Sequence, residues 1–177
     1  MTTASAVPTA AEMAAAIANL ERSREAVLAH CAGLADGAWE RSDGPGRWSA
    51  ADILEHLVIV ERRSLGLLAS MLEQPPEPDW QERTAGREAM LPRAAVAEEK
   101  IVAPPPLQPQ RGSTPPALLA DFAAARAATL AFAATPNQPL KEHTRKHPVL
   151  GTLNGYHWLL LIGYHTQRHL SQMRGCA

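Results

Sequence analysis

The feature that most constrains this fold is the spacing of its apolar residues, which recur every three or four positions in four separate segments. That spacing is typical of helices that bury one face, and no stretch shows the alternation typical of a half-buried strand. Four long helices in one chain favour an all-α fold, a four-helix bundle. The segments run from about Ala10 to Leu34, Ser49 to Leu72, Pro115 to Ala134 and Asn154 to Arg174.

Residues at the ends of these segments are typical of helix boundaries. Ser49 is a good N-cap for the second helix, and Asp52 suits its first turn. Pro115 and Pro116 suit the first turn of the third helix, and Gly175 is a plausible C-cap for the last.

A long proline-rich connection separates the second and third helices. Residues Pro75 to Pro116 hold ten of the fifteen prolines. A connection of this length is too long for a tight antiparallel turn, so we expect a crossover along the bundle, with a short helix around Glu82 to Lys100. Such a crossover either contacts a substrate or has a purely structural role.

Composition narrows the class of protein. At 177 residues the chain is long enough to bury a core, and we expect residues 1–177 to form a single domain. A formal net charge of −1 without a basic stripe argues against a nucleic-acid partner. No apolar run reaches the roughly 18 to 20 residues of a membrane helix, so no membrane association is expected.

The ends of the chain and its cysteines bear on the compartment. The N-terminus lacks the basic and strongly apolar regions of a signal peptide. Cys31 and Cys176 are far apart, which argues against a disulfide framework and favours a cytoplasmic protein. The excess of Arg over Lys, with abundant Ala and Pro, suggests a GC-rich bacterial genome.

The last helix carries two histidines four residues apart in the stretch GYHTQRHLSQM. At 100° per residue, His165 and His169 fall on its apolar face, near Trp158. They are therefore expected to point into the bundle. The opposite, polar face is expected to carry His157, Tyr164, Arg168 and Ser171.

A third histidine, His56, lies at the flank of the inner face of the second helix. Side chains four apart on a helix lie about 5 to 6 Å from each other, so His165 and His169 can reach one ion. With His56 they would form a three-nitrogen set that suits Zn, Ni, Fe or Cu. Three protein ligands leave a position open for water or substrate, as in catalytic sites.

The spacing and orientation of these histidines leave open an alternative to a metal site, since buried histidines without a metal can find other hydrogen-bond partners. The hydrolase pattern H-E-x-x-H is absent, because Thr166 follows His165. His143 and His147 also stand four apart, but Pro148 disfavours a helix there and both are expected in a loop.

Two further polar residues project toward the same interior. Glu61 needs a buried partner, either an arginine at a helix seam or a group close to a metal. Gln172, three residues after His169, is placed to hydrogen-bond a ligand, and Trp158 to line the pocket. Cys176 lies about two turns beyond His169 and is expected to be too far for the same ion.

Three stretches together resemble the DinB-like superfamily. They are GRWSAADILEHLVIVE (46–61), KHPVLGTLNGYHWLLLIGYH (146–165) and HTQRHLSQM (165–173). The family pattern has a tryptophan-serine start to a helix with a His-Leu pair, then a His-Pro-x-x-Gly-x-Leu lead-in and H-x-x-x-H with a trailing Gln. The resemblance implies a four-helix bundle whose His56, His165 and His169 bind a divalent metal, zinc or nickel.

Relatives in that family include S-transferases and isomerases that use low-molecular-weight thiols, and proteins called metal-dependent hydrolases. The resemblance therefore implies a metal-dependent thiol S-transferase acting on a small-molecule substrate, with no dedicated catalytic residue evident. A hydrolase and a non-enzymatic metal-binding stress or interaction protein stay open as alternatives. The resemblance also implies a possible homodimer.

Overall fold

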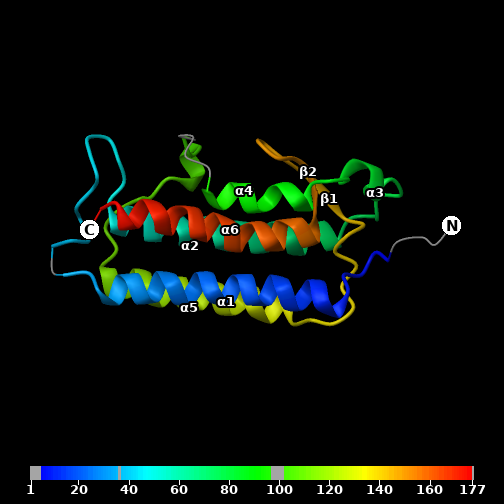
Figure 1. Cartoon of the computed structure of the whole chain (residues 1–177), viewed down its shortest axis with the longest axis horizontal. Helices are drawn as coiled ribbons and strands as arrows, with labels where there is room; N and C mark the ends of the chain where they lie inside the picture. Colours follow the sequence, from blue (N-terminus) through cyan, green and yellow to red (C-terminus); the bar gives the residue numbers. More distant parts are fainter. Residues whose placement is uncertain (1–4, 36, 97–101, 177) are drawn as a thin grey trace.

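The computed structural model describes residues 5–35, 37–96 and 102–176. Four long helices lie side by side in two layers: α1 (Ala10–Ala32) with α5 (Pro115–Ala133), and α2 (Ala50–Leu72) with α6 (Gly155–Arg174) (Figure 1). α1 packs against α5 and α6, and α2 packs against the same two helices. This arrangement confirms the predicted four-helix bundle.

The predicted crossover is present because α2 and the neighbouring α5 run in the same direction (Figure 1). Its helical parts are α3 (Trp80–Arg83), η1 (Glu88–Met90), α4 (Leu91–Val96) and η2 (Pro105–Leu107). The single short helix expected at Glu82 to Lys100 is thus divided, and residues 97–100 lie outside the described residues. α4 packs along α6 and buries Leu91 completely.

The helix starts follow the sequence markers. Ser49 and Asp52 form a reciprocal capping box at the start of α2, which satisfies two backbone donors. Thr9 and Glu12 do the same for α1. Asn154 caps α6 by accepting a hydrogen bond from the backbone N–H of His157.

A small antiparallel hairpin corrects the expectation that the chain holds no strand. β1 (Thr144–His147) pairs with β2 (Gly151–Asn154), with Thr144 opposite Asn154. Each strand has four residues and no alternation of apolar and polar side chains, so the sequence held no strand pattern to detect. His147 is therefore a strand residue, whereas His143 lies in the preceding loop.

His157 also departs from expectation. The helical wheel placed it on an outward polar face of α6, yet its exposed fraction is 5%. The wheel took account only of the bundle core, whereas the crossover packs on the outer side of α6. The prediction for His157 was therefore wrong, because a further segment of the chain covers that side of the helix.

α5 is the one helix in the described part of the chain that could cross a membrane by length and composition alone. Helices of a bundle core pass the same test, and Arg126 at the middle of α5 is fully buried within the bundle. Its guanidinium is bound to Glu61 on α2.

Candidate metal centre

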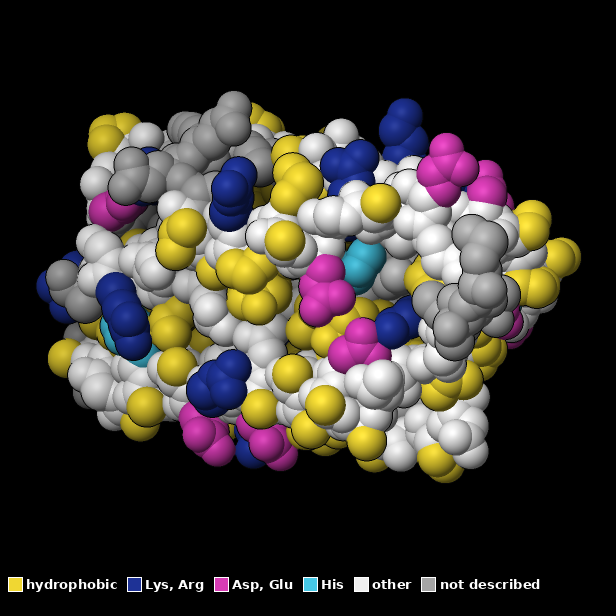
Figure 2. All heavy atoms as spheres, turned by 45° about the vertical axis from the view of Figure 1, so that its right-hand side comes forward, with side chains coloured by type: hydrophobic (Ala, Val, Ile, Leu, Met, Phe, Trp, Pro, Cys, Tyr) yellow, Lys and Arg dark blue, Asp and Glu magenta, His cyan; other side chains and the backbone are white. Residues whose placement is uncertain are grey.

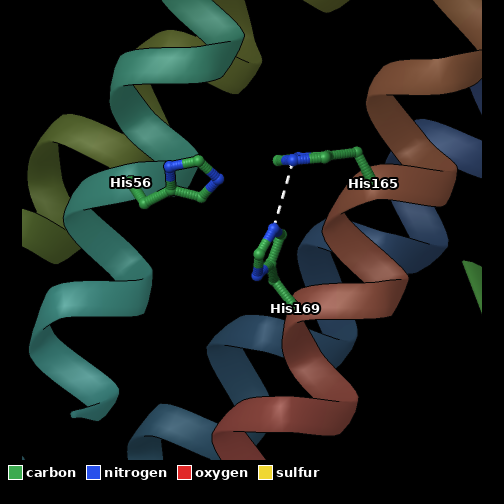
Figure 3. A group of neighbouring side chains, drawn as sticks. All are labelled: His56, His165 and His169. Atoms are coloured by element: carbon green, nitrogen blue, oxygen red, sulfur yellow. Dashed lines mark hydrogen bonds between the residues drawn. The ribbon is translucent and has the colours of Figure 1, made fainter. Parts of the chain in front are cut away.

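Three histidines converge between α2 and α6. His56 projects from α2, and His165 and His169 project from α6 toward it (Figure 3). One ligand-type nitrogen from each ring lies within 4.8 Å of the others. The ring centroids of His56 are 5.2 Å from His165 and 4.6 Å from His169. The structure thus brings together the three residues that the sequence selected.

Hydrogen bonds determine which nitrogen two of these rings present. Nδ1 of His56 lies 2.7 Å from the carbonyl oxygen of Leu107, so this nitrogen carries the proton and donates it. Nδ1 of His169 lies 2.7 Å from Oε1 of Gln172 and donates in the same way. Both rings therefore present an unprotonated Nε2. Metal-binding histidines commonly have this arrangement, in which the outer N–H is held by an oxygen.

Burial keeps the cluster uncharged. Burial lowers the pKa of His56 from its ordinary value, although the hydrogen bond to Leu107 acts in the opposite direction. Burial also holds the pKa of His165 well below its ordinary value, and the neighbouring histidines lower it further. The pKa of His169 falls to about 3, first because of burial. At neutral pH all three rings therefore carry free lone pairs.

The donor set fits a transition-metal ion. Nε2 of His165 and Nε2 of His169 face each other at 3.1 Å. Two lone pairs cannot face each other at this distance without a proton or a cation between them. Nitrogens about 2.0 Å from a tetrahedral zinc lie about 3.3 Å apart, close to the observed spacing. Three neutral imidazoles are also ligands that Zn and Ni accept.

A tryptophan that the site prediction did not include covers the cluster. The ring of Trp48 lies 4.7 Å from that of His56 and stacks 6.3 Å from that of His169. It stands just before the N-cap of α2, in the RWSAAD stretch. In the sequence that stretch indicated the start of the helix and the family resemblance, but it did not show that this side chain lies against the histidines.

The end of the crossover is fastened to α2 beside the cluster. Arg111 donates two hydrogen bonds to the carboxylate of Asp52, at 2.9 and 3.0 Å. Its backbone N–H donates to Glu55. Arg111 has a positive φ of 63°, which is uncommon for a residue with a side chain. These contacts hold η2, and with it the Leu107 carbonyl, against His56.

The remaining candidates take other positions. Glu61 pairs with Arg126, the structural alternative from the sequence, rather than with a ligand histidine. Trp158 packs against His147, with ring centroids 5.2 Å apart. Sγ of Cys176 lies 3.5 Å from the carbonyl oxygens of Trp48 and Gln172, and among the described residues Cys176 is not a member of the cluster. Of the three pocket candidates, Gln172 alone hydrogen-bonds a histidine of the cluster.

Comparison with known proteins agrees with the sequence motifs. A family model described as the DinB superfamily matches residues 19–173, a span that contains all three histidines. The chain is similar to YuaE, an uncharacterized protein of Bacillus subtilis (strain 168), with 26% identity over 146 residues. That similarity covers 80% of this chain and 85% of the relative. No solved structure matches the chain.

Proposed function

Because the chain belongs to the DinB superfamily, we propose that His56, His165 and His169 bind one divalent transition-metal ion, Zn²⁺ or Ni²⁺. We further propose that the protein is a metal-dependent S-transferase that joins a low-molecular-weight thiol to a small electrophilic substrate. The observation that carries the proposal is the convergence of three neutral imidazoles, two of them with Nδ1 already bound to an oxygen.

The protein's own residues preorganise this site. Leu107 and Gln172 orient two of the rings, so that Nε2 and not Nδ1 faces the centre. Trp48 covers one side of the cluster and limits access of water there. A bound divalent ion would supply a Lewis acid that favours the thiolate form of a coordinated thiol.

The environment of the carboxylates supports a thiol over water as the nucleophile. A metal-dependent hydrolase commonly uses a nearby glutamate as general base. Both oxygens of Glu61 are bound to Arg126, and Glu55 accepts a hydrogen bond from the backbone of Arg111. The three-ligand cluster found among the described residues contains no carboxylate. A thiolate needs no such base, which favours the transferase over the hydrolase.

Metal analysis tests the first part of the proposal. Protein purified without a histidine tag should hold close to one equivalent of metal, and added Zn²⁺ or Ni²⁺ should raise its melting temperature. His165→Ala should lose the metal, whereas His30→Gln, a histidine change on α1, should retain it. Less than about a tenth of an equivalent in the wild type, with no thermal shift, would contradict the site.

A thiol panel tests the second part. The metal-loaded protein is mixed with each of several low-molecular-weight thiols and monochlorobimane, and thioether formation is followed by fluorescence. We expect a rate with at least one thiol that disappears with a chelator and in His165→Ala. Metal binding without any such rate would exclude the transferase and leave a hydrolase or a non-enzymatic role. A cytoplasmic location and a homodimer remain predictions from the sequence.

A further inference from the structure

A pocket that contains a buried histidine lies at the opposite end of α6 from the histidine cluster. α3, η1 and the start of α6 border a solvent-open pocket of about 290 Å³. Its wall includes Trp80, Thr84, Glu88, Lys141, Asn154 and His157. Figure 2 shows the face at this end of the molecule, where a histidine side chain is visible among acidic and basic side chains.

His157 is the buried histidine of this pocket. It is 5% exposed and lines the pocket, yet its Nδ1 is buried without a hydrogen-bond partner among the residues that the structure places. Leaving a buried polar atom unsatisfied costs about 1 to 3 kcal/mol, so a bound molecule that hydrogen-bonds this nitrogen would be stabilised. Burial lowers the pKa of His157 to about 4, so at neutral pH the ring has one donor and one acceptor nitrogen.

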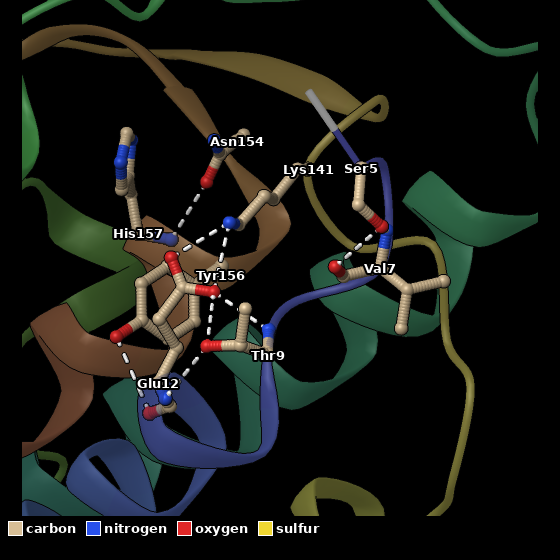
Figure 4. A network of polar contacts seen from close by, with 8 residues as sticks. All are labelled: Ser5, Val7, Thr9, Glu12, Lys141, Asn154, Tyr156 and His157. Carbon is tan, nitrogen blue, oxygen red and sulfur yellow. Dashed lines mark hydrogen bonds and ion pairs between the residues drawn. The ribbon is translucent and has the colours of Figure 1, made fainter. Parts of the chain in front are cut away.

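The side chains beside His157 are held in place by their own bonds (Figure 4). Nζ of Lys141 binds both oxygens of Glu12, at 2.6 and 2.8 Å. The hydroxyl of Tyr156 donates to the backbone carbonyl of Glu12 at 3.3 Å. Oδ1 of Asn154 accepts from the backbone of His157, which leaves its amide N–H₂ without a partner in the described chain. The pocket is therefore a preformed one.

The charges of the pocket select against charged ligands of either sign. Lys141 and Glu12 neutralise each other. The exposed carboxylate of Glu88 disfavours an anion, whereas the N-terminal end of α6 disfavours a cation. A neutral molecule that both donates and accepts hydrogen bonds is compatible with all of these groups.

The side chains of the pocket indicate which hydrogen-bonding groups that molecule carries. The amide of Asn154 supplies donors, the carboxylate of Glu88 supplies acceptors, and His157 supplies one of each. Each hydroxyl group of a polyol is both a donor and an acceptor, and Trp80 offers a half-buried aromatic surface for its C–H face. We propose that this pocket, formed by Trp80, Glu88, Asn154 and His157, binds a neutral polyhydroxylated molecule of about the size of one sugar ring.

This site is separate from the proposed metal centre. His157 and His165 are eight residues apart on α6, about 12 Å along the helix axis, and lie on different sides of it. Ligand binding at the pocket should therefore be the same in metal-loaded and chelator-treated protein. If the protein binds no metal, the proposal for this pocket is unaffected. If the pocket binds no polyol, the proposed metal centre is unaffected.

D-glucose is the probe for the test, titrated into the full chain and followed by heteronuclear NMR of the histidine rings and backbone amides. We expect saturable shifts at His157 and Asn154 with millimolar glucose. Trp80→Ala should weaken the affinity by about 3- to 10-fold through loss of the aromatic contact. Glu88→Gln should also weaken it, whereas Glu82→Gln, an exposed change on α3 outside the pocket, should not.

Acetate and methylammonium are titrated under the same conditions. Shifts at His157 with either ion, and none with glucose, would overturn the assignment to a neutral polyol. Glucose shifts that are unchanged in both Trp80→Ala and Glu88→Gln would place binding elsewhere and overturn the site. His157→Gln removes the imidazole but keeps a donor and an acceptor, and a folded variant should retain part of the affinity.

Discussion

Arg126 and Glu61 form a two-point ion pair in the centre of the bundle. Nε and Nη2 of Arg126 lie 2.6 and 3.0 Å from the two carboxylate oxygens, and the side chains are 0% and 2% exposed. Arg126 also donates to Ser23 on α1 and Thr166 on α6. One guanidinium thus connects all four long helices, and it does so beside His165, the residue before Thr166.

Breaking this pair should strongly destabilise the protein. Arg126→Met would leave the Glu61 carboxylate buried without a partner, and we expect a loss of about 3 to 5 kcal/mol in the free energy of unfolding. The exposed pair of Arg62 and Asp121 is the matched control. Arg62→Ala should cost about 0 to 1 kcal/mol. Urea unfolding measures both, and equal losses in the two variants would contradict a central role for Arg126.

Replacing two helical glycines by alanine should have opposite effects on the stability of the fold. A Cβ at Gly163 on α6 would lie 2.3 Å from Nδ2 and 2.6 Å from Cγ of Asn19 on α1. Asn19 is itself bound to Leu160 and Gln167, so it cannot move without losing those bonds. We expect Gly163→Ala to cost roughly 2 to 4 kcal/mol of stability.

Gly66 on α2 is the control, because a Cβ added there would meet no other atom of the described residues within 4 Å, apart from its chain neighbours and the backbone of its own helix. Gly66→Ala should stabilise the protein by about 0.5 to 1 kcal/mol through the better helix propensity of alanine. Thermal unfolding of both variants measures the difference. Stabilisation by both changes would mean that α1 and α6 are not in such close contact at Gly163.

The sequence predicted the bundle and the histidine cluster because both depend on helical periodicity. An i, i+4 pair on an apolar face fixes the direction of two side chains, and His56 follows from the same rule on α2. Ser49 and Asp52 indicated where α2 begins, and the structure has the helix start at that point. A helical wheel, however, considers one helix alone and does not show which other segments of the chain pack against its outer side.

The features that escaped prediction depend on contacts between distant segments. The burial of His157 results from the crossover, and the place of Trp48 over the cluster results from the loop before α2. The hairpin is stabilised by pairing between two short polar strands that have no apolar pattern of their own. An arginine was one of the two partners considered for Glu61, but only the packing of α5 identified Arg126.

Gln172 should support metal binding without touching the ion. It accepts the Nδ1–H of His169, and loss of such a partner commonly lowers metal affinity by about 10- to 100-fold. We expect that loss in Gln172→Ala, measured by competition with a chromophoric chelator. Gln172→Glu keeps an acceptor oxygen and should restore most of the affinity. The neighbouring exposed Ser171→Ala is the control, and an effect of equal size there would exclude a specific role for Gln172.

Acid should destabilise the fold in part through His157. Burial lowers its pKa from an ordinary 6.5 to about 4 in the folded protein, so the unfolded chain takes up a proton that the folded protein resists. The contribution to stability is therefore complete above about pH 6.5 and is lost as the pH falls toward 4, by about 3 kcal/mol in total.

Urea unfolding of the chelator-treated wild type and of His157→Gln, between pH 7.5 and about 4, isolates this contribution. The two proteins differ only at residue 157, so as the pH falls the wild type should lose more stability than His157→Gln. A difference that stays constant across this range would mean that His157 is protonated as easily in the fold as in the unfolded chain.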